Sequence, residues 1–250
     1  PKPLQKPHPP MWMACTNRDT IRVAARNGLG ALAFAFVDPD EARTWSGIYY
    51  DIIRSEECVP LGHSVNANLA MVSAFSIHED RAEAIRRGQE GFEFFFFAVN
   101  ALVAQDARPG RSRLWESFIR ARGDRTAELV ARAQDAGYRG AGIGTSDDMR
   151  THVREFQAAG VDQVIFLQQA GHNRHKDILA ALELFARTVA PEFQREAAAR
   201  EARKREDLAP WIARALERKQ WMRPLADDAI PIVGASRAKA EVNQAAPDRR

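Results

Sequence analysis

The sequence predicts an α/β protein built around a parallel sheet, and three observations lead to this prediction. Four short apolar runs of strand length recur along the chain, at residues 11–15, 31–37, 65–75 and 161–167. Segments with helical periodicity separate them. The runs also lack the polar–apolar alternation of a strand with one solvated face, so both faces should be covered. Strands that alternate with helices in this way favour βα units and a parallel sheet.

The composition is that of a globular protein and argues against several other classes. The 250 residues suffice for one sizeable core, and 45% of them are apolar and 28% charged. No apolar run approaches the roughly 20 residues that span a bilayer, because Asn100 interrupts the longest one, residues 94–104. Cys15 and Cys58 provide neither a disulfide framework nor metal-ligand spacing. We therefore expect a cytoplasmic protein with no membrane partner and no metal.

The positive charge of the chain is concentrated at its C-terminus. From Arg195 onward there are 13 basic and 9 acidic residues, whereas the preceding part has 23 and 24. A basic tail could contact nucleic acid, but the two signs are interspersed, as on a solvated helix. We therefore expect no nucleic-acid partner. The chain divides into residues 1–194, which carry the βα units, and a basic, helical or irregular tail at residues 195–250.

The first two helices have clear start and stop signals. Residues 16–19 offer short polar side chains that cap free N–H groups, so a helix is predicted over residues 20–27, ending at Gly28. Asp38-Pro39 opens a second helix that extends to about residue 57, since proline is favoured in the first helical turn.

The rest of the chain repeats these signals after a long helical stretch. Residues 79–137 have mostly helical periodicity, with breaks at residues 108–110 and near Gly123. Residues 142–148 form a glycine turn and an acidic helix start, which suits the positive end of the helix dipole. A final helix over residues 176–189 follows the fourth strand.

Four βα units leave two architectures open. They are too few to close an eight-stranded barrel, and an open doubly wound sheet fits the same pattern. The sequence contains no G-x-G-x-x-G or Walker-type loop. The order of elements alone does not choose between part of a barrel and an open sheet.

Several segments resemble one enzyme family when their order and spacing are taken together. They are QKPHPPMWMACTN at 5–17, IGTSDD at 143–148, AGVDQVIF at 159–166, QAGH at 169–172 and LELFA at 182–186. This series resembles the luciferase-like family of flavin-dependent monooxygenases, over about residues 3–194. The resemblance implies a (β/α)8 TIM barrel of which this chain supplies about strands 5 to 8, followed by a C-terminal helical extension. The chain is then the C-terminal half, and we expect little or no turnover from it alone.

A cofactor site is expected where the first strand meets its helix. Such a turn offers unpaired N–H groups and the helix dipole to an anion. The Thr16 hydroxyl and the Asn17 amide can donate hydrogen bonds, and Arg18 can add charge. The resemblance implies that this loop, Cys15 to Arg18, contacts the phosphate of FMN. A plain helix cap is the alternative interpretation of the same residues.

Further candidate residues lie on the same predicted face. Gly144 and Thr145 form a second turn at a helix start, where phosphates often bind in barrels. Behind the fourth strand, Gln169, Gly171 and His172 could line a substrate pocket, and so could Phe96 of the Phe94–Phe97 run. Ordinary capping and core packing are the alternatives. No residue is assigned as the catalytic acid or base.

The activity that the resemblance implies is oxygenation of a small organic substrate with reduced FMN and O2 as co-substrate. A separate flavin reductase would supply the reduced cofactor, and the full-length form would be a homo-oligomer. The residues do not separate FMN from a deazaflavin. Two alternatives remain: a non-catalytic half-barrel that binds flavin or a phosphorylated ligand, and a different phosphate-binding barrel enzyme.

Overall fold

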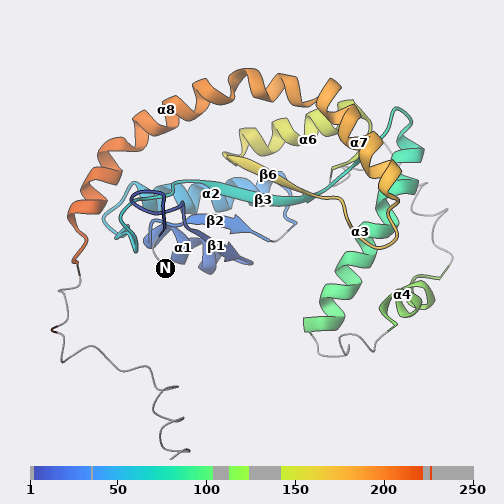
Figure 1. Ribbon diagram of the computed structural model, residues 1–250, viewed down its shortest axis with the longest axis horizontal. Helices are drawn as coiled ribbons and strands as arrows, with labels where there is room; N and C mark the ends of the chain where they lie inside the picture. Colours follow the sequence, from blue (N-terminus) through green and yellow to red (C-terminus); the bar gives the residue numbers. More distant parts are fainter. Residues whose placement is uncertain (1–2, 35, 104–112, 124–141, 222–225, 227–250) are drawn as a thin grey trace, which may run out of the picture. The chain divides into compact units, whose positions relative to one another are not determined.

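The computed structural model describes residues 3–34, 36–103, 113–123, 142–221 and 226 (Figure 1). The chain forms one compact unit over residues 1–219 and a second over residues 220–250. The first unit contains the strands and helices described below.

Four parallel strands form the main sheet, as predicted. They are β1 (Trp12–Cys15), β2 (Gly30–Ala33), β3 (Leu69–Ala74) and β6 (Gln163–Leu167). Their order across the sheet is β1, β2, β3, β6, and every neighbouring pair is parallel. Each new strand is therefore added at the same edge of the sheet. A doubly wound sheet reverses this direction at a switch point, so the order is that of a barrel segment.

The helices follow the predicted pattern with small shifts at their ends. The break near Gly123 is confirmed, because this residue caps the helix before it; the break predicted at residues 108–110 lies outside the described residues. The helices are α1 (Arg18–Arg26), α2 (Pro39–Ile53), α3 (Arg81–Val103), α4 (Leu114–Arg122), α6 (Ser146–Ala158), α7 (His175–Thr188) and α8 (Ala190–Glu217).

The main core lies between the sheet and the helices on one of its faces. Buried residues of α1, α2, α6 and α8 pack there against the side chains that alternate strand residues turn toward them. Fully buried members include Ile21, Tyr49, Leu69, Phe156 and Leu208.

The opposite face of the sheet is more open. Trp12, Phe34 and Ile165 are 37%, 42% and 42% exposed. In a closed barrel this face is the packed interior. The contrast between the two faces is consistent with a sheet that forms part of a barrel.

A long connection between β3 and β6 is fastened by a second, two-stranded sheet. β4 (Ser76–Ile77) pairs in parallel with β5 (Ile143–Gly144). Next to β5, Gly142 has φ +81°, and a Cβ atom there would lie 2.2 Å from the carbonyl oxygen of Ala74. Only glycine satisfies both conditions. These two-residue strands were not predicted, because they are too short to show a periodicity.

A partly buried polar network attaches α8 to the N-terminal end of the sheet. Lys204 Nζ lies 2.9 Å from Asp162 Oδ1 and 2.6 Å from Asn68 Oδ1. The second carboxylate oxygen of Asp162 accepts hydrogen bonds from the Leu69 N–H, at 2.7 Å, and from the Tyr50 hydroxyl. Burial, followed by the nearby Asp162 charge, raises the pKa of Tyr50. The predicted tail boundary at residue 194 falls within α8, which continues as part of the first unit.

Removing the cation of this network should destabilise the fold. Lys204→Met leaves the mostly buried Asp162 carboxylate without its ion partner. Losing one member of a fully buried pair costs about 3–5 kcal/mol, so about 2–4 kcal/mol is expected for this partly exposed pair. Chemical denaturation should show this decrease in the free energy of unfolding. Arg205→Met is the matched control, because its 76% exposed side chain has, among the described residues, exposed Glu201 at 3.8 Å as its one ion partner and should contribute little. Equal effects of the two substitutions would contradict the assigned role of Lys204.

Candidate functional site

The turn between β1 and α1 lies at the C-terminal end of the sheet and is ordered by reciprocal capping. Asn17 is the N-cap residue, and its Oδ1 accepts a hydrogen bond from the Thr20 N–H at 3.0 Å. The Thr20 hydroxyl in turn accepts from the N–H groups of Thr16 and Asn17, at 3.0 and 3.2 Å. The sequence analysis did not assign Thr20. Its position three residues after the cap was the available signal.

The turn presents two polar side chains to solvent. Thr16 and Asn17 are exposed, and within the described residues the Thr16 hydroxyl forms no hydrogen bond. Asn17 caps the helix through its oxygen, so its amide N–H groups are the part that could donate to a ligand. Cys15 differs, because its fully buried thiol donates to the carbonyls of Met13 and Thr20, and burial raises its pKa.

Arg18 is held by a carboxylate of the neighbouring helix. Its Nε and a terminal nitrogen lie 2.8 and 2.5 Å from the two oxygens of Glu41. The Glu41 oxygen nearer to Nε also accepts a hydrogen bond from the Trp45 indole. The hydrogen bonds from Arg18 and then Trp45 lower the pKa of Glu41 to about 2. The Arg18 charge is thus largely compensated, and it links α1 to α2.

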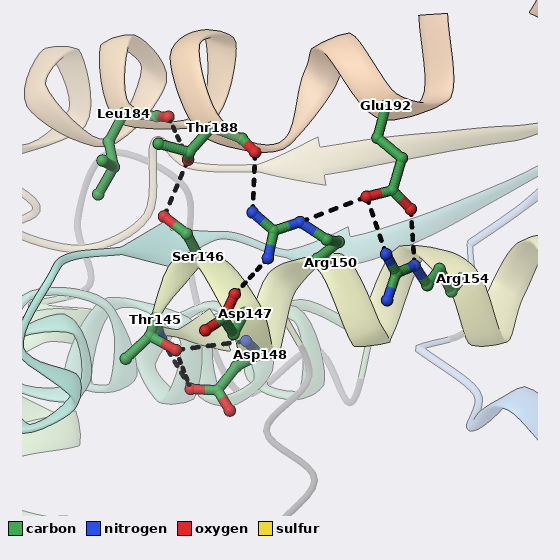
Figure 2. A network of polar contacts seen from close by, with 9 residues as sticks. All are labelled: Thr145, Ser146, Asp147, Asp148, Arg150, Arg154, Leu184, Thr188 and Glu192. Atoms are coloured by element: carbon green, nitrogen blue, oxygen red, sulfur yellow. Dashed lines mark hydrogen bonds and ion pairs between the residues drawn. The ribbon is translucent and has the colours of Figure 1, made fainter. Parts of the chain in front are cut away.

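The second predicted turn, Gly144-Thr145, is already occupied by a carboxylate of the chain (Figure 2). Asp148 Oδ2 accepts from the Thr145 N–H and from its hydroxyl, at 2.8 Å each, and Arg81 forms a bidentate pair with the same carboxylate. Burial alone would raise the pKa of Asp148, but the hydrogen bonds from Arg81 and Thr145 outweigh it and lower the pKa. A ligand phosphate at this turn would have to displace an internal anion.

The same helix, α6, is tied to the junction of α7 and α8 through Arg150 and Arg154 (Figure 2). Arg150 donates to the Thr188 carbonyl at 3.0 Å and pairs with Asp147 and, at 3.3 Å, with Glu192. Arg154 forms a bidentate pair with Glu192, at 2.6 and 3.0 Å. These contacts have a structural role, because they hold α6 against α7 and α8.

Five phenylalanines gather beyond the C-terminal end of β2, and we call them the Phe36 cluster. Phe34 and Phe36 follow β2, whereas Phe92, Phe95 and Phe96 come from α3. The Phe36 ring centroid lies 4.8 Å from that of Phe96, 5.3 Å from Phe92, 5.7 Å from Phe95 and 5.9 Å from Phe34, in edge-on geometry. Phe34 and Phe96 are 42% and 37% exposed. The cluster therefore presents an apolar surface.

A second aromatic group, the Trp115 cluster, lies on another side of α3. Phe94 and Phe97 of α3 meet Trp115 and Phe118 of α4. The His172 ring stacks on Trp115 with centroids 3.7 Å apart and planes at 28°. The Phe94–Phe97 run thus packs against two different neighbours.

The loop after β6 supplies the remaining predicted residues. Gly171 has φ +55°, and a Cβ atom there would lie 2.8 Å from the Trp115 ring, so glycine allows the loop to approach α4. Gln169 is exposed in this loop. Gln168, which precedes Gln169 at the predicted ligand face, has a buried Oε1 with no hydrogen-bond partner among the described residues. This oxygen is a hydrogen-bond acceptor without a described partner, and it lies just after the C-terminal end of β6.

The predicted residues therefore fall into separate groups. The β1–α1 turn adjoins the Phe36 cluster, because the Phe34 N–H donates to the Cys15 carbonyl at 2.8 Å. Gly171 and His172 belong to the Trp115 cluster, and α3 joins it to Phe96. Gly144 and Thr145 lie at the N-terminus of α6, where Asp148 caps the turn. Over the described residues, no group of three His, Cys, Asp or Glu suits a metal ion, and no helix has the length and apolarity to cross a bilayer.

Comparison with known proteins identifies the family. The family model described as luciferase-like monooxygenase matches residues 1–163. The chain belongs to the luciferase-like monooxygenase family. Its members are oxidoreductases that use flavin-type cofactors. The search of curated proteins gave no match.

Comparison with solved structures gives matches over about half of each matched chain. The monooxygenase RslO1 from Streptomyces bottropensis aligns with a TM-score of 0.50 and 19% identity, over 77% of this chain and 51% of that one. Apo-MsnO8 aligns with a TM-score of 0.49 and 18% identity, over 74% and 52%. A coenzyme F420 dependent tetrahydromethanopterin reductase from Methanopyrus kandleri aligns with 0.43 and 18%, over 74% and 51%. The chain thus spans about half the length of the structures it matches.

One buried histidine should make stability depend on pH. His152 of α6 lies 2.8 Å from the Ser73 hydroxyl, and burial lowers its pKa to about 4. Below the ordinary value of about 6.5, the unfolded chain binds a proton that the folded chain excludes. The free energy of unfolding should therefore fall by about 2 kcal/mol between pH 7.5 and 5, and the loss should level off below pH 4.

Denaturation of a His152→Gln variant at both pH values checks this assignment. The variant should lose most of the pH-dependent change, whereas His175→Gln, at an exposed position, should keep it. An unchanged pH profile in His152→Gln would show that other groups cause the dependence.

Proposed function

We propose that this chain is part of an oxidoreductase that uses reduced FMN and O2 to oxygenate a small organic substrate. Family membership supports the reaction class. The flavin phosphate would bind at the β1–α1 turn, and the substrate would lie against the aromatic residues at the C-terminal end of the sheet.

The observation that carries the proposal is the proximity of two unlike surfaces. The β1–α1 turn offers hydrogen-bond donors at a helix N-terminus, which suit a phosphate. The Phe36 cluster, joined to it through the Phe34–Cys15 backbone hydrogen bond, offers an apolar aromatic surface. FMN combines an anionic tail with a flat aromatic ring, so this pair of surfaces fits its chemistry.

The residues of the turn fit a phosphate through neutral hydrogen-bond donors. The Thr16 hydroxyl and the Asn17 amide are exposed donors, and the capping by Thr20 fixes the backbone from which they project. Arg18 would contribute charge only if it left Glu41. When bound, reduced flavin supplies the electrons that activate O2. The role left to the chain is to hold the cofactor, orient the substrate and exclude water.

The substrate is proposed to be apolar. Phe96 and Phe36 carry no polar group, and Gln169, Gly171 and His172 border the other side of α3. A flavin reductase and a homo-oligomeric assembly remain proposals that follow from the family. Because the matched structures are about twice as long, we also propose that a complete pocket needs further strands.

A second candidate is a half-barrel that binds flavin or another phosphorylated ligand without catalysis. The observation in its favour is the same coverage of about half of each matched structure. It differs from the first candidate in that bound flavin would give no oxygenated product under any supply of reductant and substrate.

An FMN titration of the chain, followed by flavin fluorescence, tests the phosphate site. In Thr16→Ala/Asn17→Asp the helix cap is kept, while both side-chain donors are lost and a negative charge faces the phosphate. FMN affinity should fall by about 1–3 kcal/mol, the cost of losing charged hydrogen bonds. Riboflavin has no phosphate, so its affinity should stay the same in the variant. Thr151→Ala, on the exposed surface of α6, is the control.

The two flavins separate the possible failures. Equal weakening of FMN and riboflavin in the double variant would place the phosphate elsewhere. Binding of neither flavin by the unmodified chain would overturn the proposal for this chain and leave its sheet as a scaffold only.

A further inference from the structure

A polar groove lies at the opposite end of the sheet from the β1–α1 turn. It has a volume of about 560 Å³ and lies between α2, the start of β6 and α8. Tyr50 of α2 and Arg54, the C-cap residue of that helix, line one side. Asp162, directly before β6, and Arg200 and Arg203 of α8 line the rest. This volume is within the range of small-molecule sites.

The charges in the groove divide into a compensated and an uncompensated set. Lys204 pairs with Asp162 at 2.9 Å and with Glu201 at 3.1 Å. By contrast, the guanidinium groups of Arg54, Arg200 and Arg203 form no ion pair or hydrogen bond with any residue that the structure describes. Among the described lining residues, Asp207 is the one carboxylate that likewise has no ion pair or hydrogen bond. The uncompensated set is therefore net positive.

The three arginines come from two elements, and the surrounding contacts hold those elements in place. The Arg54 guanidinium lies 5.5 Å from the centre of the Tyr50 ring, a cation–π arrangement. The Tyr50 hydroxyl is bound to Asp162, which also fixes α8 through Lys204. The network thus sets the distance between α2 and α8 before any ligand binds.

We infer that this groove binds a small polyanion carrying phosphate or carboxylate groups. A guanidinium presents a planar fork of donors that matches these groups and stays charged at every physiological pH. Three such groups around one groove suit a ligand with more than one negative charge. The site is independent of the proposed flavin site, since it uses none of its residues and lies at the other end of the strands.

Titration calorimetry of the full chain at low ionic strength tests this inference, with pyrophosphate and citrate as probes. Arg200→Gln/Arg203→Gln should weaken binding at least tenfold, and Arg54→Gln, from the other element, should weaken it as well. Arg195→Gln/Arg205→Gln makes the same charge change on α8 outside the groove and should leave binding within about twofold. Binding of pyrophosphate alone would assign the groove to phosphates, and preference for citrate would assign it to carboxylates.

Two further results decide the inference. If the control weakens binding as much as the groove variants, or if neither probe binds, the groove is not a polyanion site. Thr16→Ala/Asn17→Asp should bind pyrophosphate normally, and loss of binding there would place the anion at the β1–α1 turn instead. Thermal unfolding of each variant checks that the fold is intact, and Arg54→Gln gives the answer if the α8 variant does not fold.

Discussion

The carboxylate of Asp162 is the contact on which the rest of the first unit depends. One of its oxygens accepts from the backbone of β3 and from a hydroxyl of α2, and the other pairs with Lys204 of α8. Because Asp162 directly precedes β6, one side chain joins two neighbouring strands and two helices. An uncompensated carboxylate at this depth would be costly, so the partners must come together for the fold to form. The N-terminal end of the sheet is therefore fixed by electrostatics as much as by packing.

The C-terminal end is built differently. Its backbone turns are capped internally, by Thr20 at α1 and by Asp148 at α6, so these helix starts are stable without a ligand. Between them the side chains are aromatic and partly exposed. This division of roles is typical of barrel enzymes, in which the N-terminal end supports stability and the C-terminal end carries ligands.

Much of the fold could be predicted from the sequence because its signals are local. The four strands are continuous apolar runs, and Asn17, Pro39 and Thr145 mark helix starts by their own chemistry. What could not be predicted depends on distant partners. The pairing of Arg18 with Glu41, the occupation of the Thr145 turn by Asp148 together with Arg81, and the stacking of His172 on Trp115 each join residues that only the folded chain brings together. Family resemblance supplied the choice of a barrel, which strand order then supported.

The double packing of α3 has a mechanical consequence. One rigid helix carries Phe96 on the side of β2 and Phe94 on the side of α4 and the loop after β6. A rotation or slide of this helix therefore changes the spacing of both aromatic groups at once, because packed rings move as units and do not deform. Gly88 and Gly91 allow α3 to lie close against Ser76 and the carbonyl of Ala170, which leaves little room for tilting. The surface beside the β1–α1 turn and the stack on His172 are thus held at a fixed spacing by the same helix.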